Sequence, residues 1–402
     1  MFAQDQEWPP ARKISAFVET AILIFVFPIN QSLESSEILT SGRGDMLDRR
    51  TLLTAGAAAS LSAGLSKRSP AEPSARPGRK IRVGALNVGA YTFWGIWARI
   101  LSPGGSFGTG LLNMEVTHCW DVNRELAEKF AAEHDCQVVD RYDGMIGEVD
   151  AIAFGGLYEV PWQHRLARPY VDAGVPTYLS RPFSYRLRDI DSILELAAKR
   201  GTPLMATSCQ EHLYQATHLQ QHVKNCGVIK SVHGLCRSDE YPAHFHIQWF
   251  ILKALGYDID KVSLLTDDER KASYLQETML FKEKPGQPAF AAALHGVTGS
   301  HALYLKIMGD RGSETITMDR SANRKEELYS YFAPQLVDMQ RTFEGHSYQP
   351  LDVIRKKTQV FLAGYYSHLE RHGALVPVDS VPVDWSPRHF KPGWMDESTF
   401  SA

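Results

Sequence analysis

The chain has 402 residues, a formal net charge of −3 and an aromatic content of 10%. This length is sufficient for two domains, each with its own core. Because a nucleic-acid surface needs clustered Lys and Arg, and the sequence has no such block, we expect no nucleic-acid partner. The cysteines have no CxxC spacing, which favours buried free thiols over a disulfide framework; they are Cys119, Cys136, Cys209, Cys226 and Cys236.

Residues 46–79 are predicted to be an export signal and its linker. Arg49 and Arg50 precede an apolar stretch rich in Ala, Gly and Ser, residues 52–65, and a polar spacer follows. This order is typical of a twin-arginine signal peptide. We therefore expect a periplasmic or secreted protein; an accidental Arg-Arg pair before a linker is the alternative.

Residues 1–45 are expected to be an extension outside the fold. If Met46 is the true start, this extension is not translated. Its apolar run, residues 21–27, is shorter than the ~20 residues that span a bilayer. We expect no stable membrane span after processing, with a membrane anchor as the alternative.

Residues 80–203 alternate between predicted strands and helices, as in a doubly wound α/β sheet. Strands are predicted at 80–89, 114–120, 149–154 and 176–179, and helices at 92–100, 123–134, 160–174 and 189–201. The strands end on Gly, Asp or Pro-containing turns. Because such sheets bind ligands at the carboxyl ends of their strands, we expect a ligand site there.

Residues 204–378 are predicted to form a second α/β domain with a mostly antiparallel open sheet. Strands at 229–235, 273–281, 289–297 and 303–308 follow one another through short turns, and helices at 211–225, 246–255 and 352–371 accompany them. Direct strand-to-strand succession is typical of antiparallel sheets. Residues 379–402 are expected to be a surface tail.

Five segments in chain order resemble the oxidoreductase family named for glucose-fructose oxidoreductase, inositol dehydrogenase and the rhizopine-catabolism protein (Gfo/Idh/MocA). They are IRVGALNVG, CWDVNRELAEKFAAEH, VDAIAFGGLYEVPWQH, AGVPTYLSRPFSYRLRDIDSILELAAKRG and HFHIQWFILKALG. The similarity covers residues 80–378. It implies a Rossmann domain, a second domain whose open sheet supports homo-oligomers, a nicotinamide cofactor and a carbohydrate substrate.

The resemblance places a dinucleotide at the first two strand ends. The GxGxxG turn falls on residues 87–92, where the middle Gly89 is retained and would admit the pyrophosphate. Asn87 is tolerable because Asn adopts left-handed conformations more readily than most residues. Asp121 stands where an acid binds the adenosine ribose, which favours NAD over NADP. The alternatives are a turn without phosphate and an Asp121 that only caps the next helix.

At the next two strand ends, Gly155, Gly156 and His164 match the family loop that passes the nicotinamide. Arg181 and Pro182 stand where the family has Lys-Pro. Arg181 can bind hydroxyls or a carboxylate, but it cannot give up a proton near neutrality. The alternatives are an ordinary helix residue for His164 and a structural salt bridge for Arg181.

The resemblance places the proton-transferring group at His246, ten residues before Gly256. Histidine titrates near neutrality and suits proton exchange with a hydroxyl; His244 is a second catalytic candidate. Trp249 replaces the usual Asp and could stack on a sugar or pack in the core. The leading hypothesis is an NAD(P)-dependent oxidoreductase for a sugar, sugar acid or glycoside, with a tightly bound, recycled cofactor.

Two other functions remain open. Residues His244, His246, His295 and His301, with Glu240 or Glu277, have the donor types that zinc prefers. They would suit a nicotinamide-independent, metal- or His-dependent carbohydrate lyase or hydrolase. A non-catalytic carbohydrate-binding protein on the same fold is the second alternative, because a fold does not determine function.

Overall fold

The computed structural model describes most of the chain beyond the predicted signal segment. The described residues are 79–89, 93–101, 112–156, 160–213, 216, 218–237, 244–267, 272–297, 302–319, 325–387 and 395–400. The twin-arginine segment, the extension before it, Glu240, His301 and the side chain of His244 lie outside this description. Within these ranges, no helix combines the length and apolar character that crossing a bilayer requires.

The first sheet is parallel and, in the described residues, has six strands in the order β3-β2-β1-β4-β5-β6. They are β1 (Ile81–Leu86), β2 (Met114–Trp120), β3 (Gln137–Val138), β4 (Ala151–Phe154), β5 (Thr177–Leu179) and β6 (Leu204–Ala206). The predicted doubly wound sheet is confirmed. Its order reverses between β1 and β4, the switch point at which such sheets bind ligands. Strand β6 extends this sheet beyond the expected boundary at residue 203.

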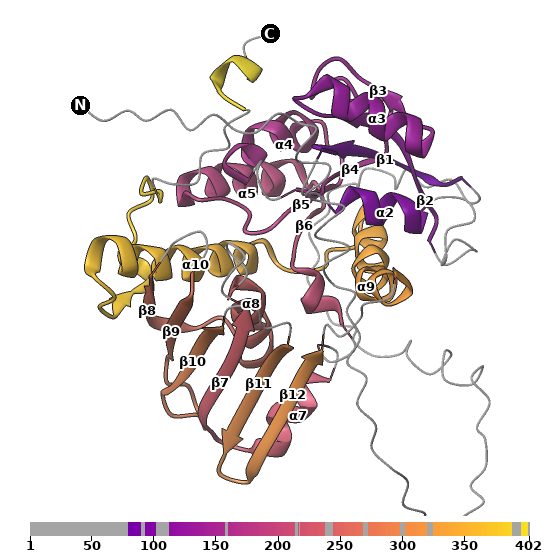
Figure 1. Ribbon diagram of the computed structural model, residues 1–402. Coiled ribbons are helices and arrows are strands. Elements are labelled where there is room, and N and C mark those ends of the chain that lie inside the picture. The colour runs from indigo at the N-terminus through magenta and orange to yellow at the C-terminus, as the bar shows by residue number, and fades with distance from the viewer. Residues whose placement is uncertain are drawn as a thin grey trace, which may run out of the picture. The chain divides into compact units, whose positions relative to one another are not determined.

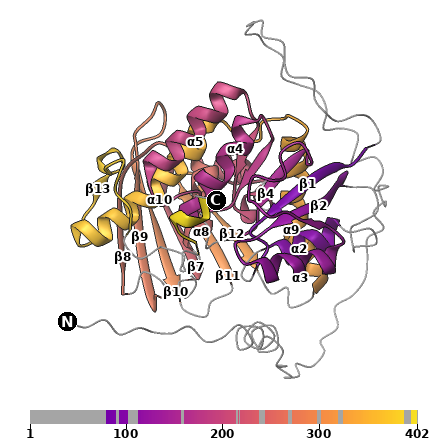
Figure 2. The same cartoon turned by 90° about the horizontal axis from the view of Figure 1, so that it is seen from above.

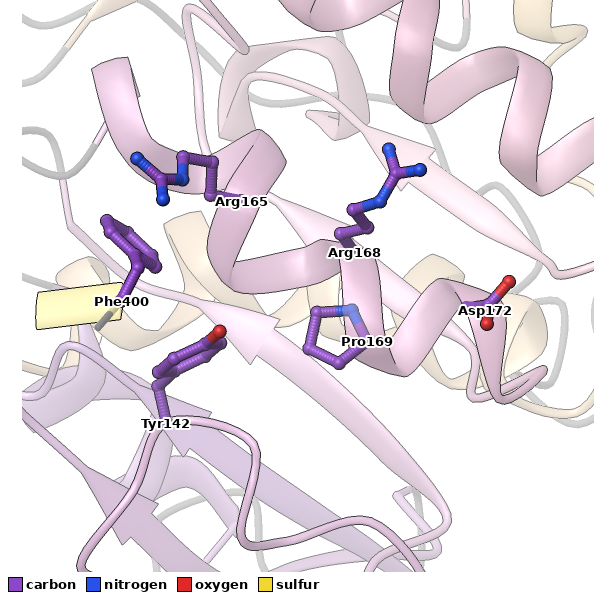
Figure 3. A pocket seen from close by; sticks show the side chains of 6 residues that line it. All are labelled: Tyr142, Arg165, Arg168, Pro169, Asp172 and Phe400. Atoms are coloured by element: carbon purple, nitrogen blue, oxygen red, sulfur yellow. The ribbon is translucent and has the colours of Figure 1, made fainter. Parts of the chain in front are cut away.

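Helices cover both faces of this sheet (Figure 2). Helices α2 (Trp94–Leu101) and α3 (Arg124–His134) lie on one face, and α4 (Gln163–Asp172) and α5 (Leu187–Arg200) lie on the other. Alternate β1 residues point to opposite faces, so Ile81, Val83 and Ala85 join the cluster around α2, and Leu86 joins that around α4.

The second sheet is mostly antiparallel, as predicted, with the order β12-β11-β7-β10-β9-β8-β13. Its strands are β7 (Ile229–Arg237), β8 (Ile259–Thr266), β9 (Tyr274–Phe281), β10 (Phe290–Val297), β11 (Ala302–Gly309), β12 (Gly312–Asp319) and β13 (Val376–Pro377). Strands β7 and β10 pair in parallel. Helices α8 (His244–Leu255) and α10 (Leu351–Arg371) lie along the sheet (Figure 1).

The single helix expected at residues 211–225 is wrong. In the described part of this stretch, the 3₁₀ turn η3 (Cys209–His212) and the shorter helix α7 (Leu219–Cys226) take its place. Ser208 and Glu211 form a capping box that starts η3, and Leu213 then takes an extended conformation with ψ 156°. The chain therefore leaves the helical path after one turn.

The two sheets share one buried core. One buried cluster contains Leu179 at the end of β5 and Phe183, which follows β5. The same cluster includes Trp249 of α8 and Phe361 of α10. The rings of Phe183 and Trp249 are stacked with centroids 4.8 Å apart. Helix α9 (Lys325–Phe343) packs on α2 in the second cluster. The carboxyl edge of the first sheet is thereby joined to α8, where His246 lies.

Candidate active site

Asn87 directly follows β1 and has a left-handed φ of 55°. Its side chain is 6% exposed, and neither amide atom has a hydrogen-bond partner among the described residues. A buried polar group without a partner costs about 1–3 kcal/mol. Such a group at the switch point of an α/β sheet is well placed to bind a polar ligand.

Asp121 joins the ends of β1 and β2. One carboxylate oxygen accepts the backbone N–H of Gly89 at 2.8 Å, and the other accepts that of Asn123 at 2.9 Å. Burial raises the pKa of Asp121 above its ordinary value, against the lowering effect of these amides. The side chain of Asn123 caps α3 by accepting from the backbone of Glu125 and Leu126. Asp121 therefore does not supply the cap, and its oxygens can each accept a further hydrogen bond.

The end of β4 lies against an indole. The Phe93 amide donates to the Gly155 carbonyl at 2.8 Å, and Trp94 Nε1 donates to the Leu86 carbonyl at 3.1 Å. A Cβ on Gly155 would overlap the ring of Trp94. Gly155, the glycine expected beside a nicotinamide, is thus needed here because the Trp94 ring packs against its Cα. Phe93 and Trp94 link the end of β1 to the end of β4 at the switch point through these two hydrogen bonds. Gly156, which follows, is buried.

Arg181 follows β5 and is only 3% exposed. Its guanidinium lies 4.0 Å from the centre of the Phe93 ring and 5.9 Å from that of Phe245, and Nη1 donates to Ser180 Oγ at 3.3 Å. The peptide between Arg181 and Pro182 is cis. Cation–π contacts fix the plane of the guanidinium, so this side chain can bind and orient a polar ligand.

His246 is held at the start of α8 by Ser208, which is not among the residues predicted from the sequence. Its Nδ1 lies 2.5 Å from Ser208 Oγ, and its ring lies against that of Phe245, with centroids 4.1 Å apart and planes tilted by 39°. Phe245 also contacts Arg181, so it brings the two predicted catalytic side chains to one place. The Ser-x-x-Glu pattern from Ser208 to Glu211 was the available signal, because it is typical of a capping box.

The predicted His164 packs between helices. Its Nε2 lies 3.6 Å from the Asp189 carboxylate of α5, and burial lowers its pKa, while Asp189 opposes this shift. The preceding Gln163 is fully buried, and neither of its amide atoms has a partner within the described ranges. Gln163 is the first residue of α4, on its sheet-facing side with Leu166. We therefore add Gln163 to the candidate site; its place on the apolar face of the helix was the missed signal.

The residues of the metal hypothesis are not all brought together. His295 is exposed on β10 and is paired with Gln276 of β9. The next β9 residue, Glu277, points to the opposite face, where Gln248 donates to it at 2.7 Å. Because they lie on opposite faces of one sheet, His295 and Glu277 cannot bind the same ion. Among the described residues, no three His, Cys, Asp or Glu side chains gather as metal ligands.

Solved structures with this arrangement of two sheets include several dehydrogenases. The protein has the fold of inositol and sugar dehydrogenases. The apo scyllo-inositol dehydrogenase from Lactobacillus casei matches with a TM-score of 0.63 and 14% identity, over 75% of this chain and 99% of that chain. The same enzyme with bound NAD(H) and scyllo-inositol gives 0.60 and 14%, over 75% and 100%.

Levoglucosan dehydrogenase in complex with NADH and levoglucosan matches with a TM-score of 0.59 and 11% identity, over 75% of this chain and 100% of that chain. No family model and no curated protein matches the sequence. The resemblance inferred from the five segments is therefore confirmed at the level of the fold.

Proposed function

We propose that the protein is a nicotinamide-dependent oxidoreductase that acts on a sugar, sugar acid or glycoside. The fold supports this class, since similar structures hold NAD(H) with scyllo-inositol or NADH with levoglucosan. The observation that carries the proposal is the pair of buried amides, Asn87 and Gln163, with unmet hydrogen bonds at the carboxyl edge of the sheet. Amides can both donate and accept, as binding of hydroxyl and carboxamide groups requires.

The residues fit both ends of a dinucleotide. Asp121 would bind the adenosine ribose and favours NAD, because its charge would repel a 2′-phosphate. Asn87 follows β1 and Gln163 begins α4, where their amides would bind polar groups of the cofactor between its adenosine and the substrate. When bound, the nicotinamide ring accepts or donates the hydride.

His246 would exchange the proton of the reacting hydroxyl, and Ser208 would hold its imidazole in place. Arg181 would bind a substrate hydroxyl or carboxylate, since its guanidinium keeps its charge at all physiological pH values. A tightly bound cofactor, recycled within each turnover, suits the exported location that the twin-arginine pattern predicts.

Nucleotide content tests this proposal. The full chain is purified without added cofactor and denatured, and the released small molecules are identified by mass spectrometry. We expect stoichiometric NAD, and at least a tenfold loss of affinity in Asp121→Asn. This variant keeps an oxygen for the Gly89 amide but loses the charge. Asp140→Asn is the matched control, because this carboxylate is exposed and pairs with Arg124 on the surface. Protein that neither carries nor binds NAD or NADP would contradict the proposal.

A second candidate is a nicotinamide-independent, His-dependent carbohydrate lyase or hydrolase. The contacts of Phe93 and Trp94 with Gly155 favour this candidate. In a dinucleotide-binding fold, a glycine at a strand end leaves room for the cofactor, whereas here these two residues pack against Gly155. Carbohydrate turnover without bound nucleotide, abolished by His246→Ala, would support this candidate over the oxidoreductase.

A further inference from the structure

Two cysteines from separate elements meet at the edge of the first sheet. Cys119 is a fully buried residue of β2, and Cys136 is a half-buried residue between α3 and β3. Cys119 is part of the buried cluster around α2 and α3, and Cys136 packs against that cluster, which brings the two thiols into contact. This juxtaposition of two thiols involves neither a metal nor the candidate active-site residues.

The surrounding backbone holds both cysteines against the same helix. Cys119 Sγ donates to the Ala127 carbonyl at 3.6 Å, and the Cys136 amide donates to the Ala131 carbonyl at 3.3 Å, one turn further along α3. The Val139 amide donates to the Cys119 carbonyl at 3.0 Å and closes the edge of the sheet. The two side chains therefore face each other from fixed backbone positions.

The two thiols differ in reactivity. Contact with Cys119 lowers the pKa of Cys136, while the same contact, together with burial, raises the pKa of Cys119. Cys136 is also the more exposed of the two. Because the thiolate is the nucleophile in disulfide exchange, Cys136 is the residue that meets an external reagent, and Cys119 is the residue that can resolve the product.

We propose that Cys119 and Cys136 are a redox-active pair that forms a reversible disulfide by exchange with an external disulfide. The Cys136 thiolate attacks one sulfur of the external disulfide, whose S–S bond breaks; a mixed disulfide forms and one thiolate leaves. Cys119 then loses its proton to solvent and attacks Sγ of Cys136, which releases the second thiolate. Two protein thiols are oxidised, and one external disulfide is reduced to two thiols.

The bond would constrain the ligand-binding edge of the sheet. It would close a loop that contains all of α3 and Asp121, two residues after Cys119. The proposed export would deliver the protein to a compartment in which disulfides persist. The pair is independent of the proposed enzymatic function.

Thiol counting with peptide mapping tests the pair. The full chain is incubated with oxidised glutathione, its remaining thiols are alkylated, and it is digested without reduction. We expect the loss of two of the five thiols and a linked peptide of Cys119 and Cys136. Cys119→Ala should stop with glutathione on Cys136, and Cys136→Ser should lose no thiol. Cys226→Ser, a buried cysteine of α7, is the control and should still form the link.

The melting temperature gives a second readout. Closing a loop of this length should raise the Tm by roughly 5 °C in the oxidised wild-type protein. The same treatment should leave the Tm of Cys136→Ser unchanged. A wild-type protein that keeps all five thiols, or retains glutathione on Cys136 without forming the link, would overturn the proposal.

Discussion

Ser208 determines how His246 presents its imidazole. Ser208 Oγ accepts the Gln210 amide at 3.2 Å and lies 2.5 Å from Nδ1 of His246, to which its hydroxyl can donate in one of the two imidazole tautomers. A neutral imidazole that accepts at Nδ1 carries its hydrogen on Nε2. Such a ring is prepared to donate toward a substrate oxygen, as carbonyl reduction requires.

Removing the His246 imidazole should lower turnover more than removing the Ser208 hydroxyl. We expect His246→Ala to lower kcat by about 10²–10⁴-fold, the usual contribution of a positioned acid or base. Ser208→Ala should lower it less and shift the pH dependence of kcat, and Ser208→Thr should restore both because it retains a hydroxyl. Steady-state kinetics over a pH series measures these effects. Equal kcat and an unchanged pH profile in Ser208→Ala would remove Ser208 from the mechanism.

Glu277 makes stability depend on pH. It is fully buried, Gln248 is its hydrogen-bond donor, and burial raises its pKa to about 8, against the lowering effect of Gln248. In the unfolded chain this carboxyl titrates near pH 4.3. Between these values the folded state holds a proton that the unfolded state has lost. Its contribution to stability is therefore complete below about pH 4 and is lost as the pH rises toward 8.

Glu277→Gln should remove this dependence, because the amide stays neutral at every pH. Urea unfolding at pH 6 and pH 9 is expected to show a larger loss of stability with pH in the wild-type protein, by roughly 1–3 kcal/mol. Glu283→Gln is the control, since this side chain lies on the exposed turn after β9. Parallel pH curves for wild type and Glu277→Gln would show that Glu277 is charged in the folded protein.

The sequence identified site residues at strand ends and missed those defined by distant contacts. Asn87, Asp121 and Arg181 stand at or near the ends of predicted strands, so local pattern places them at the sheet edge. Ser208 becomes relevant through His246, which lies 38 residues later. Gln163 becomes relevant only once the buried face of α4 is known. Local pattern indicates a capping box at Ser208 and an apolar helix face at Gln163, but it does not show that either residue lies at the candidate site.

At the scale of elements, a buried ion pair supports η3. Lys357 Nζ of α10 lies 3.1 and 3.0 Å from the two carboxylate oxygens of Glu211 and 3.2 Å from the Ala206 carbonyl. Glu211 Oε1 also accepts the Ser208 amide at 2.8 Å. Burial lowers the pKa of Lys357, and Glu211 opposes this shift. Ser208, which contacts His246, is thus linked to α10 through Glu211 and Lys357.

Breaking this pair should be costly. Lys357→Met leaves a buried carboxylate without its cation, and we expect a loss of about 3–5 kcal/mol in the free energy of unfolding. Adding Glu211→Gln should recover part of it, because the buried charge is then removed. Lys356→Met is the matched control: Lys356 pairs with Asp352 on the exposed side of the same helix and should cost below about 1 kcal/mol. Urea unfolding of the four proteins measures the differences.

Element prediction failed where apolar periodicity is weak. Strand β8 contains Asp260 and Lys261, and β12 is rich in Ser, Thr and Glu, so the sequence pattern predicts neither as a strand. Both are held by pairing with a neighbour, β9 and β11 respectively. Helix α9 contains Pro334, which discourages a helix prediction, yet its buried residues pack against α2. Tertiary contacts outweigh local propensity in these elements.

At the scale of the whole molecule, we propose that the chain is exported through the twin-arginine route. Replacing Arg49 and Arg50 by Lys should retain the protein inside the cell, because that route recognises the arginine pair. Fractionation of cells that express the full chain, followed by immunoblotting, measures this. Replacing Arg43 by Lys, outside the pair, is the control and should leave export unchanged. Equal export of all three proteins would refute the assignment.

The core that runs from the first sheet through α8 and α10 has a thermodynamic consequence. Because Phe183, Trp249 and Phe361 belong to one buried cluster, neither sheet can lose its packing without exposing the other's. The described fold should therefore melt as one cooperative unit, with a single calorimetric transition whose van't Hoff and measured enthalpies agree. A change that loosens the ligand-binding edge would then lower the stability of the entire fold, which couples the evolution of specificity to that of stability.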